Sequence, residues 1–225
     1  MTRREDRVLL ANVLVVAICA LIYELLCGTL ASFLLGDAVL QFSLVLGTYL
    51  SAMGVGAWIS KRLEPNAAAR YVQAEMALAL VGGLSVPALL LAVQAHVPLR
   101  PALFAAVFVI GVLVGLELPL LVHILRKRGD AKFGDTVARA FAYDYAGALV
   151  ASVLFPLVLV PRLGLVRTSV LAGVLNAAAA LSALLVLRPE RRRAFVGMAT
   201  SAAVVLAILA VAFVRAEAWT AAATD

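Results

Sequence analysis

Charged residues are scarce in this chain of 225 residues. Asp, Glu, Lys and Arg make up 14% of it, whereas an ordinary globular domain carries about a quarter. Hydrophobic residues make up 64%, and the mean hydropathy is +1.05. The shortage of charge excludes a soluble globular domain. It indicates an integral membrane protein whose main partner is the lipid bilayer.

The sequence also lacks the motifs of common catalytic and cofactor sites. It has no glycine-rich nucleotide loop, no Ser/His/Asp constellation and no spacing typical of zinc ligands. The two cysteines, Cys19 and Cys27, lie about 12 Å apart along one helix, which is too far for a disulfide. We therefore expect no catalytic residue, no cofactor and no metal site in this polypeptide.

The net charge of +6 does not indicate a nucleic-acid partner. Lys and Arg are confined to short segments between apolar stretches, and no basic recognition helix accompanies them. Membrane topology and anionic lipid headgroups explain such a distribution. We therefore exclude nucleic-acid binding.

Seven apolar stretches have close to the roughly 20 residues that a helix needs to cross a bilayer. They predict an all-α integral membrane fold, with one transmembrane domain over residues 1–225. The predicted helices cover residues 8–34, 39–59, 72–93, 101–124, 140–160, 166–187 and 194–214.

The basic residues are distributed unevenly between the two sides of this fold. If the N terminus is cytoplasmic, fifteen of the nineteen Lys and Arg residues lie on the inner side, and only Arg100, Arg162, Arg167 and Arg215 lie outside. The positive-inside rule then fixes the orientation. We predict a multi-pass protein of the bacterial cytoplasmic (inner) membrane, with a cytoplasmic N terminus and with Asp225 outside.

Three carboxylates lie deep inside predicted helices: Glu24 in the first, Glu117 in the fourth and Asp144 in the fifth. No Lys or Arg lies within the same spans. A charge at bilayer depth costs about 3 kcal/mol or more, so it faces the protein interior, pairs with a cation or stays protonated. Three such acids without a basic partner indicate a site for a positively charged ligand.

Tyrosines adjoin these acids. Tyr23 precedes Glu24, and Tyr143 and Tyr145 flank Asp144. Aromatic rings attract ammonium groups through the negative face of the ring, so they suit the same ligand as the carboxylates. We predict that the three acids and three tyrosines form a substrate-binding site for an organic cation.

Other readings of the buried polar residues stay open. Each acid can instead be protonated and hydrogen-bonded to a neighbouring helix, where it holds the bundle together. Glu75 lies beside Arg70 near the inner end of the third predicted helix, so we expect it to be an interfacial ion-pair partner. We expect Asn176 and His123 to be packing hydrogen-bonders.

Small residues recur at four-residue spacing in several predicted helices. This spacing lets helix backbones approach closely, so it predicts packing contacts at Gly111, Gly115, Gly56 and Gly147.

Proline removes a backbone donor and can free a carbonyl. Pro119 follows Glu117 by two residues, so we predict a helix break beside that acid. The signal is weaker at Pro87 and Pro156.

The basic segment RKRGDAKFGDTVAR after the fourth predicted helix has two readings. It is either a solvated inner loop, as the positive-inside rule requires, or a docking surface for a cytoplasmic partner.

Four short motifs occur in the order of one known family: Tyr23-Glu24, Glu117-Leu118-Pro119, Asp144-Tyr145 and Pro161-Arg162-Leu163-Gly164-Leu165. On these motifs, the first six predicted helices resemble the membrane region of membrane-bound polyamine aminopropyltransferases, the spermidine synthase-like family. Members of that family usually continue into a soluble Rossmann-like domain, which transfers an aminopropyl group from decarboxylated S-adenosylmethionine to putrescine. The resemblance covers no such domain here, so we expect no transferase activity from this polypeptide alone.

The same membrane region is also similar to half of a major-facilitator transporter. That resemblance implies a three-plus-three inverted repeat of the first six helices, with a site near the repeat interface.

Two functions follow from these patterns. The chain either binds or transports a polyamine-like organic cation through its intramembrane carboxylates, or is a noncatalytic membrane anchor of a separate soluble aminopropyltransferase. It can also be the membrane part of a truncated enzyme. The small-residue faces further allow a homo-oligomer.

Overall fold

The computed structural model describes residues 3–128, 133–187 and 192–222. These residues form eight α-helices, one 3₁₀ turn, η1, and one π-helical turn, η2, and contain no strand. In chain order the elements are α1 Arg3–Leu35, α2 Ala38–Leu63, η1 Glu64–Asn66, α3 Ala67–Gly83, α4 Ser85–Gln94, α5 Leu99–Arg128, α6 Phe133–Leu154, η2 Phe155–Leu159, α7 Val160–Leu187 and α8 Arg192–Ala222.

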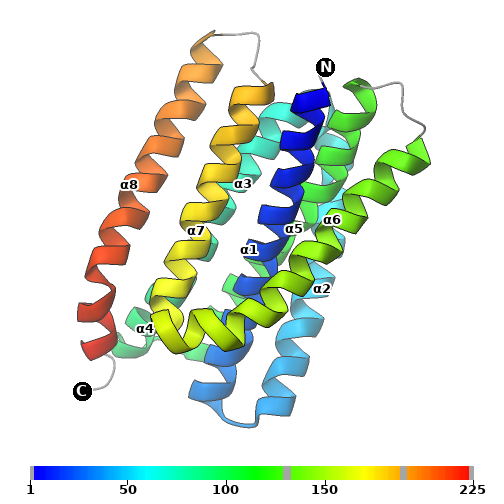
Figure 1. Cartoon of the computed structure of the whole chain (residues 1–225). Coiled ribbons are helices and arrows are strands. Elements are labelled where there is room, and N and C mark those ends of the chain that lie inside the picture. The colour runs from blue at the N-terminus through cyan, green and yellow to red at the C-terminus, as the bar shows by residue number, and fades with distance from the viewer. Residues whose placement is uncertain (1–2, 129–132, 188–191, 223–225) are drawn as a thin grey trace.

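Within the described residues, five continuous helical stretches are long and apolar enough to cross a membrane. Two of them, Ala38–Gly83 with 46 residues and Gly134–Leu187 with 54, greatly exceed the roughly 20 residues of a single crossing. Figure 1 shows that each folds back on itself. The first stretch turns between α2 and α3, where η1 lies, and the second has its non-helical kink at Gly164, inside α7. These stretches support a membrane protein, but they do not confirm the predicted count of seven helices.

Large apolar side chains also cover much of the outer surface. Phe33, Val39, Leu157 and Val214 are among those that are largely exposed. Such a surface suits hydrocarbon rather than water, because continuous apolar patches are rare on soluble monomers. The composition and the surface therefore agree on a membrane environment.

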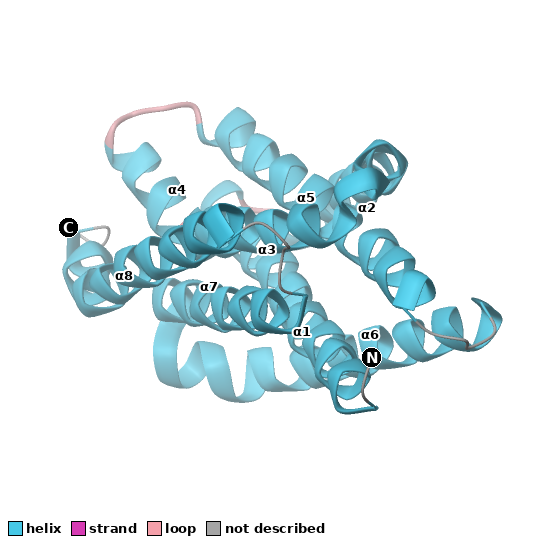
Figure 2. Ribbon diagram, turned by 90° about the horizontal axis from the view of Figure 1, so that it is seen from above, coloured by secondary structure: helices cyan, strands magenta, loops and turns pink. Residues whose placement is uncertain are grey.

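The helix α1 lies at the centre of the bundle (Figures 1 and 2) and packs against α2, α5, α6 and α7. The helix α8 lies at the edge, against α7 and α3. The most extensive contact between two helices joins α2 and α5. The interior therefore forms where the faces of α1, α3, α5 and α7 meet.

Glycines explain the close approach of α2 to α5. A methyl group at Gly56 would meet the backbone of Val112 and Gly115, and one at Gly115 would meet the backbone of Met53. A methyl at Gly111 would lie 2.7 Å from Cβ of Ala52. The packing contacts expected from the sequence at these glycines are therefore seen, and Gly147 makes an equivalent contact between α6 and α1.

The break between α3 and α4 lies at Leu84, three residues before Pro87. Pro87 has no N–H to give to the carbonyl of Gly83 four residues earlier. Ser169 of α7 fills this role, because its hydroxyl donates to the carbonyls of Gly83 at 2.8 Å and Gly82 at 3.0 Å. The third predicted helix is thus split in two, and the weaker proline signal marks a true break.

The prediction of a helix break at Pro119 was wrong. The helix α5 runs through this residue without interruption to Arg128. A proline inside a helix removes one backbone hydrogen bond, and the neighbouring turns here keep the helix continuous. The irregular backbone lies elsewhere, in the π-helical turn η2 with Pro156 and at Gly164, which has φ of 70°.

One end of the bundle collects the helix ends that carry basic residues. The start of α1, the turn η1, the end of α5 and the start of α8 all lie at this end in Figure 1. Lys61 and Arg62 close α2 there. Residues 129–132 of the predicted docking loop, together with Arg188, Arg191 and Asp225, lie outside the described residues.

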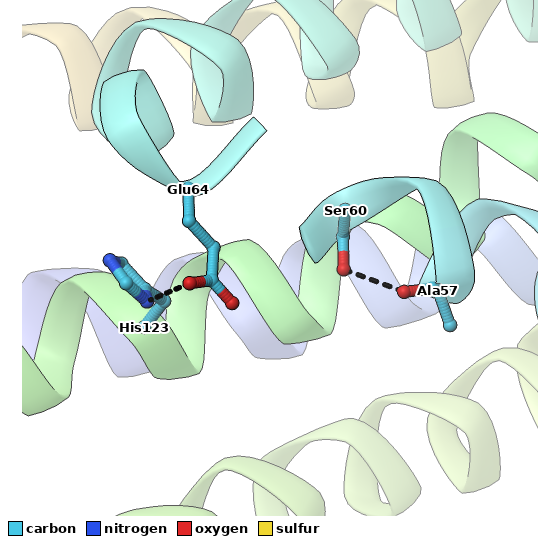
Figure 3. Close-up of polar contacts among 4 residues, drawn as sticks. All are labelled: Ala57, Ser60, Glu64 and His123. Carbon is cyan, nitrogen blue, oxygen red and sulfur yellow. Dashed lines mark hydrogen bonds and ion pairs between the residues drawn. The ribbon is translucent and has the colours of Figure 1, made fainter. Parts of the chain in front are cut away.

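At the same end, an ionisable pair ties the α2–α3 connection to α5 (Figure 3). Nδ1 of His123 on α5 lies 3.5 Å from Oε2 of Glu64 in η1. In the preceding turn, the hydroxyl of Ser60 donates to the carbonyl of Ala57 at 2.7 Å. His123 thus contacts an acid of η1, whereas the sequence predicted a packing hydrogen bond.

Candidate functional site

A cavity of about 60 Å³ lies between α1, α2, α3, α5 and α6. Its polar lining consists of Tyr71, Glu117 and Asp144, and the remaining lining residues are apolar. This volume holds on the order of four waters, since one water needs about 10–15 Å³ measured in this way. The cavity therefore places two of the three predicted acids around one small space.

Glu117 is held in this space by α5 and is only 5% exposed. Its Oε1 is shielded from solvent and has no hydrogen-bond partner among the described residues. The glycine contacts of Gly111 and Gly115, six and two residues earlier, fix α5 against α2. A buried carboxyl oxygen without a donor is costly, so an additional proton or cation must satisfy it.

Asp144 reaches the cavity from α6 and is half-buried. Gly147, one turn later, packs α6 onto α1, since a methyl there would lie 2.5 Å from the carbonyl of Leu14 and 2.8 Å from Cβ of Ala17. Ala17 also lines the cavity. The close contact of α6 with α1 therefore sets the position of Asp144.

Glu24 is half-buried on α1 but does not line this cavity. The nearby Tyr49 of α2 donates its hydroxyl to the carbonyl of Ala20 at 3.1 Å. Tyr49 lies close enough to Glu24, Glu117 and Asp144 to be acted on electrostatically by each of them. The three acids thus share a neighbour, while only Glu117 and Asp144 share a cavity.

The structure places the three predicted tyrosines outside the cavity lining. Tyr23 is fully buried, and its ring lies against Gly82 of α3. Tyr143 is 41% exposed and Tyr145 is 68% exposed. Tyr145 stacks on Phe141, with 5.9 Å between the ring centroids. The aromatic wall expected beside Asp144 is not seen, because neighbours of a residue on a helix point to other faces.

Tyr71 takes the place of those tyrosines, and sequence reasoning missed it. It comes from α3, is buried and lines the cavity. Its hydroxyl lies near the carboxyl of Glu75, one turn later on the same helix. The spacing of four residues between Tyr71 and Glu75 was the signal that could have identified the pair.

The prediction of an interfacial ion pair for Glu75 was wrong. Glu75 has no exposed surface, and Asn176 of α7 donates its amide to Oε2 at 2.9 Å and to the backbone carbonyl of Glu75 at 3.0 Å. Arg70 instead donates to Gln73 at 3.0 Å. Glu75 lies more than one helical turn after Arg70, so it lies in the interior of the bundle rather than at its end.

The four intramembrane acids form no salt bridge with Lys, Arg or His in the part of the chain that the structure describes. In that same part, no three residues of the His, Cys, Asp and Glu types stand together as potential metal ligands. The site is therefore a small, mostly apolar cavity with two carboxyl groups. Its chemistry suits a compact cationic group with an apolar remainder.

No family model matches the chain, and no solved structure matches it. Curated proteins do. Polyamine aminopropyltransferase 2 of Ralstonia nicotianae is 51% identical over 189 residues, which are 83% of this chain and 37% of that protein. The polyamine aminopropyltransferase of Leptospira interrogans is 45% identical over 202 residues, which are 90% of this chain and 40% of that protein.

These relatives support the family that the motifs indicate. Polyamine aminopropyltransferase 2 of Streptomyces coelicolor, at 45% identity over 220 residues, is a further relative and is matched over 39% of its length. The chain thus spans about two fifths of the length of these relatives. The similarity to these three relatives covers between 83% and 92% of this chain.

Proposed function

We propose that this chain is a multi-pass membrane protein of polyamine metabolism, and that its cavity binds an ammonium group of a polyamine-like organic cation between Glu117 and Asp144. The carrying observation is the buried Oε1 of Glu117, which has no donor among the described residues and belongs to a cavity shared with a second carboxyl. An ammonium group supplies both the missing donors and the missing charge.

The apolar lining favours an organic cation over a metal ion. Calcium takes six to eight oxygen ligands, and magnesium requires nearly ideal octahedral geometry. Two carboxyl groups and one tyrosine hydroxyl among apolar side chains do not supply either shell. Methylene groups of an alkyl amine, in contrast, gain free energy by leaving water for such walls.

The names of the relatives support the same class of ligand. The relatives from Ralstonia, Leptospira and Streptomyces are named polyamine aminopropyltransferases. A membrane region that binds polyamines beside such an enzyme would concentrate its substrate or remove its product. Binding and transport are both served by an intramembrane site of this kind.

The proposed topology has seven crossings. The two longest apolar stretches fold back, one at η1 and the other at the Gly164 kink, and supply two crossings each, while α1, α5 and α8 supply one each. The end of the bundle with Lys61 and Arg62 then faces the cytoplasm of a bacterial cell, by the positive-inside rule. In this orientation the N terminus is cytoplasmic and the C terminus is outside.

The test is direct binding of radiolabelled putrescine and spermidine to the full chain in lipid nanodiscs. We expect saturable binding by the wild type and at least roughly tenfold weaker binding by Glu117→Gln, because removing one member of a buried charge pair costs about 2 kcal/mol or more. Glu64→Gln, a matched change at an acid outside the cavity, keeps the wild-type affinity. Absence of binding by the wild type would end the proposal.

A second candidate function rests on the extent of the similarity. The relatives carry the name of a transferase, and the chain matches about two fifths of their length. The chain would then anchor a separately encoded aminopropyltransferase, or be the membrane part of a longer one. Co-purification of such an enzyme with the wild type, and its loss after neutralising Arg126 and Lys127, would support anchoring. Failure to recover the enzyme with the wild type would refute it.

A further inference from the structure

Four buried polar atoms without hydrogen-bond partners among the described residues belong to four different helices. They are the hydroxyl of Tyr23 on α1, Oε1 of Glu75 on α3, Oε1 of Glu117 on α5 and Oδ1 of Asn176 on α7. We call these four residues the inner polar cluster. Glu117 belongs both to this cluster and to the cavity lining, so it connects the two.

The members of the inner polar cluster lie close together. The amide of Asn176 bonds to the carboxyl of Glu75 at 2.9 Å. Glu75 lies near enough to Glu117 for its charge to act on that carboxyl group, and both acids act electrostatically on Tyr23. Tyr71, whose hydroxyl lies near the Glu75 carboxyl, itself lines the cavity, so polar groups extend from the cavity to Glu75.

No cation faces Glu75 from the described helices around it. Its titratable neighbours are Tyr71 on its own helix, Cys19 and Tyr23 on α1, and Glu117 on α5. Asn176 faces it from α7. The helix α4 has no charged residue, and the described side chains of α8 have none from Phe195 to Val214.

Two ionised carboxylates without a counter-charge are strongly disfavoured in a low-dielectric interior. A single proton removes the repulsion, and a protonated carboxyl group also becomes a donor for one of the unpartnered oxygens. The same neutralising charge can come from an ammonium group. A proton and an ammonium group therefore compete for one site.

We propose that Glu75 and Glu117 together hold one exchangeable proton, and that an ammonium group entering the cavity displaces this proton to water. The inference rests on the cation site proposed above. One carboxyl O–H bond breaks and one proton leaves, while one positive charge enters, so the charge of the interior does not change. Asn176 is a positioning residue, because its amide holds the Glu75 carboxyl in place.

Calorimetry of putrescine binding to the full chain in nanodiscs tests this exchange. Repeating the titration in buffers with different ionisation enthalpies measures the protons released per amine bound. We expect about one proton from the wild type and from Glu64→Gln. Glu75→Gln should bind putrescine and release almost none. Equal release by Glu75→Gln and the wild type would overturn the proton site and leave the cation site standing.

Two further measurements test for the shared proton by other means. If the wild type does not bind putrescine, the cation site is refuted. The proton can then still be detected, because protonated carboxyl groups have their own infrared absorption band. A band that disappears at high pH in the wild type and is missing in Glu75→Gln supports the proton site, and identical spectra overturn it.

If Glu75→Gln does not fold, Tyr71→Phe replaces it. In this variant the pH at which half of the carboxyl band has disappeared should be higher than in the wild type, because a donor to the carboxylate is lost. An unchanged midpoint overturns the proton site.

Discussion

The amide of Asn176 on α7 donates both to the carboxyl and to the backbone carbonyl of Glu75 on α3, at 2.9 and 3.0 Å. One side chain thus fixes a buried acid and ties together two helices that are 101 residues apart in sequence. Both residues are completely buried. The bond therefore serves the stability of the bundle as well as the position of the acid.

Replacing Asn176 with Leu should destabilise the protein. The change removes the donor to Glu75 at nearly constant size and leaves buried acceptors unsatisfied, at a cost of about 1–3 kcal/mol. Unfolding by sodium dodecyl sulfate in mixed micelles, followed by circular dichroism, measures this cost. Ser51→Ala is the control, because Ser51 is exposed and bonds only within its own helix, to Gly47 at 2.7 Å. Equal stability of Asn176→Leu and the wild type would contradict this role.

Two glycines of α2 should respond in opposite ways to alanine. A methyl at Gly56 meets the backbone of α5, so Gly56→Ala should cost about 1–3 kcal/mol through overpacking. A methyl at Gly54 meets nothing within 4 Å, so Gly54→Ala should leave stability unchanged or raise it by up to about 1 kcal/mol. The same unfolding assay compares them. Equal effects of the two changes would contradict the packing of α2 on α5.

Ser169→Ala should destabilise the protein at the break between α3 and α4. The carbonyl of Gly83 receives no bond from Pro87, and the variant also removes the serine hydroxyl, at a cost of about 1–2 kcal/mol. Ser152→Ala is the control, since Ser152 is exposed and bonds to Leu149 of its own helix at 2.8 Å. Thermal unfolding of both variants shows the difference, and indistinguishable transitions would refute the prediction.

Replacing tyrosines one at a time tests which of them contributes to binding in the cavity. Tyr71→Phe should weaken putrescine binding about fivefold, because the hydroxyl at the cavity wall contributes about 1 kcal/mol. Tyr145→Phe should leave the affinity unchanged, because Tyr145 is 68% exposed and does not line the cavity. Equilibrium binding in nanodiscs measures both. A larger loss in Tyr145→Phe would restore the expectation from the sequence.

The contributions of Asp144 and Glu24 to putrescine binding can be distinguished in the same way. Asp144→Asn should weaken putrescine binding about tenfold, because it removes one of the two charges at the cavity. Glu24→Gln should change the affinity by less than about threefold, since its carboxyl lies outside the lining and acts only through space. The ratio of the two affinities is the result to measure. Equal losses would mean that Glu24 contacts the amine.

The sequence predicted the membrane class and the close glycine contacts because these depend on local composition and spacing. Apolar stretches of sufficient length and glycines four residues apart are visible without any tertiary information. The depth of Glu117 also follows from counting residues along α5. Each of these features is a property of a single helix.

The missed features all depend on partners far along the chain. Glu75 was assigned to the interface from its neighbour Arg70, whereas its actual partner, Asn176, lies 101 residues away. The sequence favoured a break at Pro119 over one at Pro87, yet only Pro87 follows a break, where Ser169 of α7 supplies the missing donor. The orientation of Tyr145 away from the cavity is set by how α6 packs on α1.

The glycine-mediated contact of α2 with α5 also has a mechanical consequence. Backbones that touch at Gly56 and Gly115 cannot slide past each other without a clash, so these two helices behave as one stiff unit. The helix α6 touches α5 much less. Because Gly147 holds α6 against α1 in the same way, any gating motion would move α6 together with α1 relative to α5. It would change the separation between Asp144 and Glu117, the two anions that a bound amine draws together.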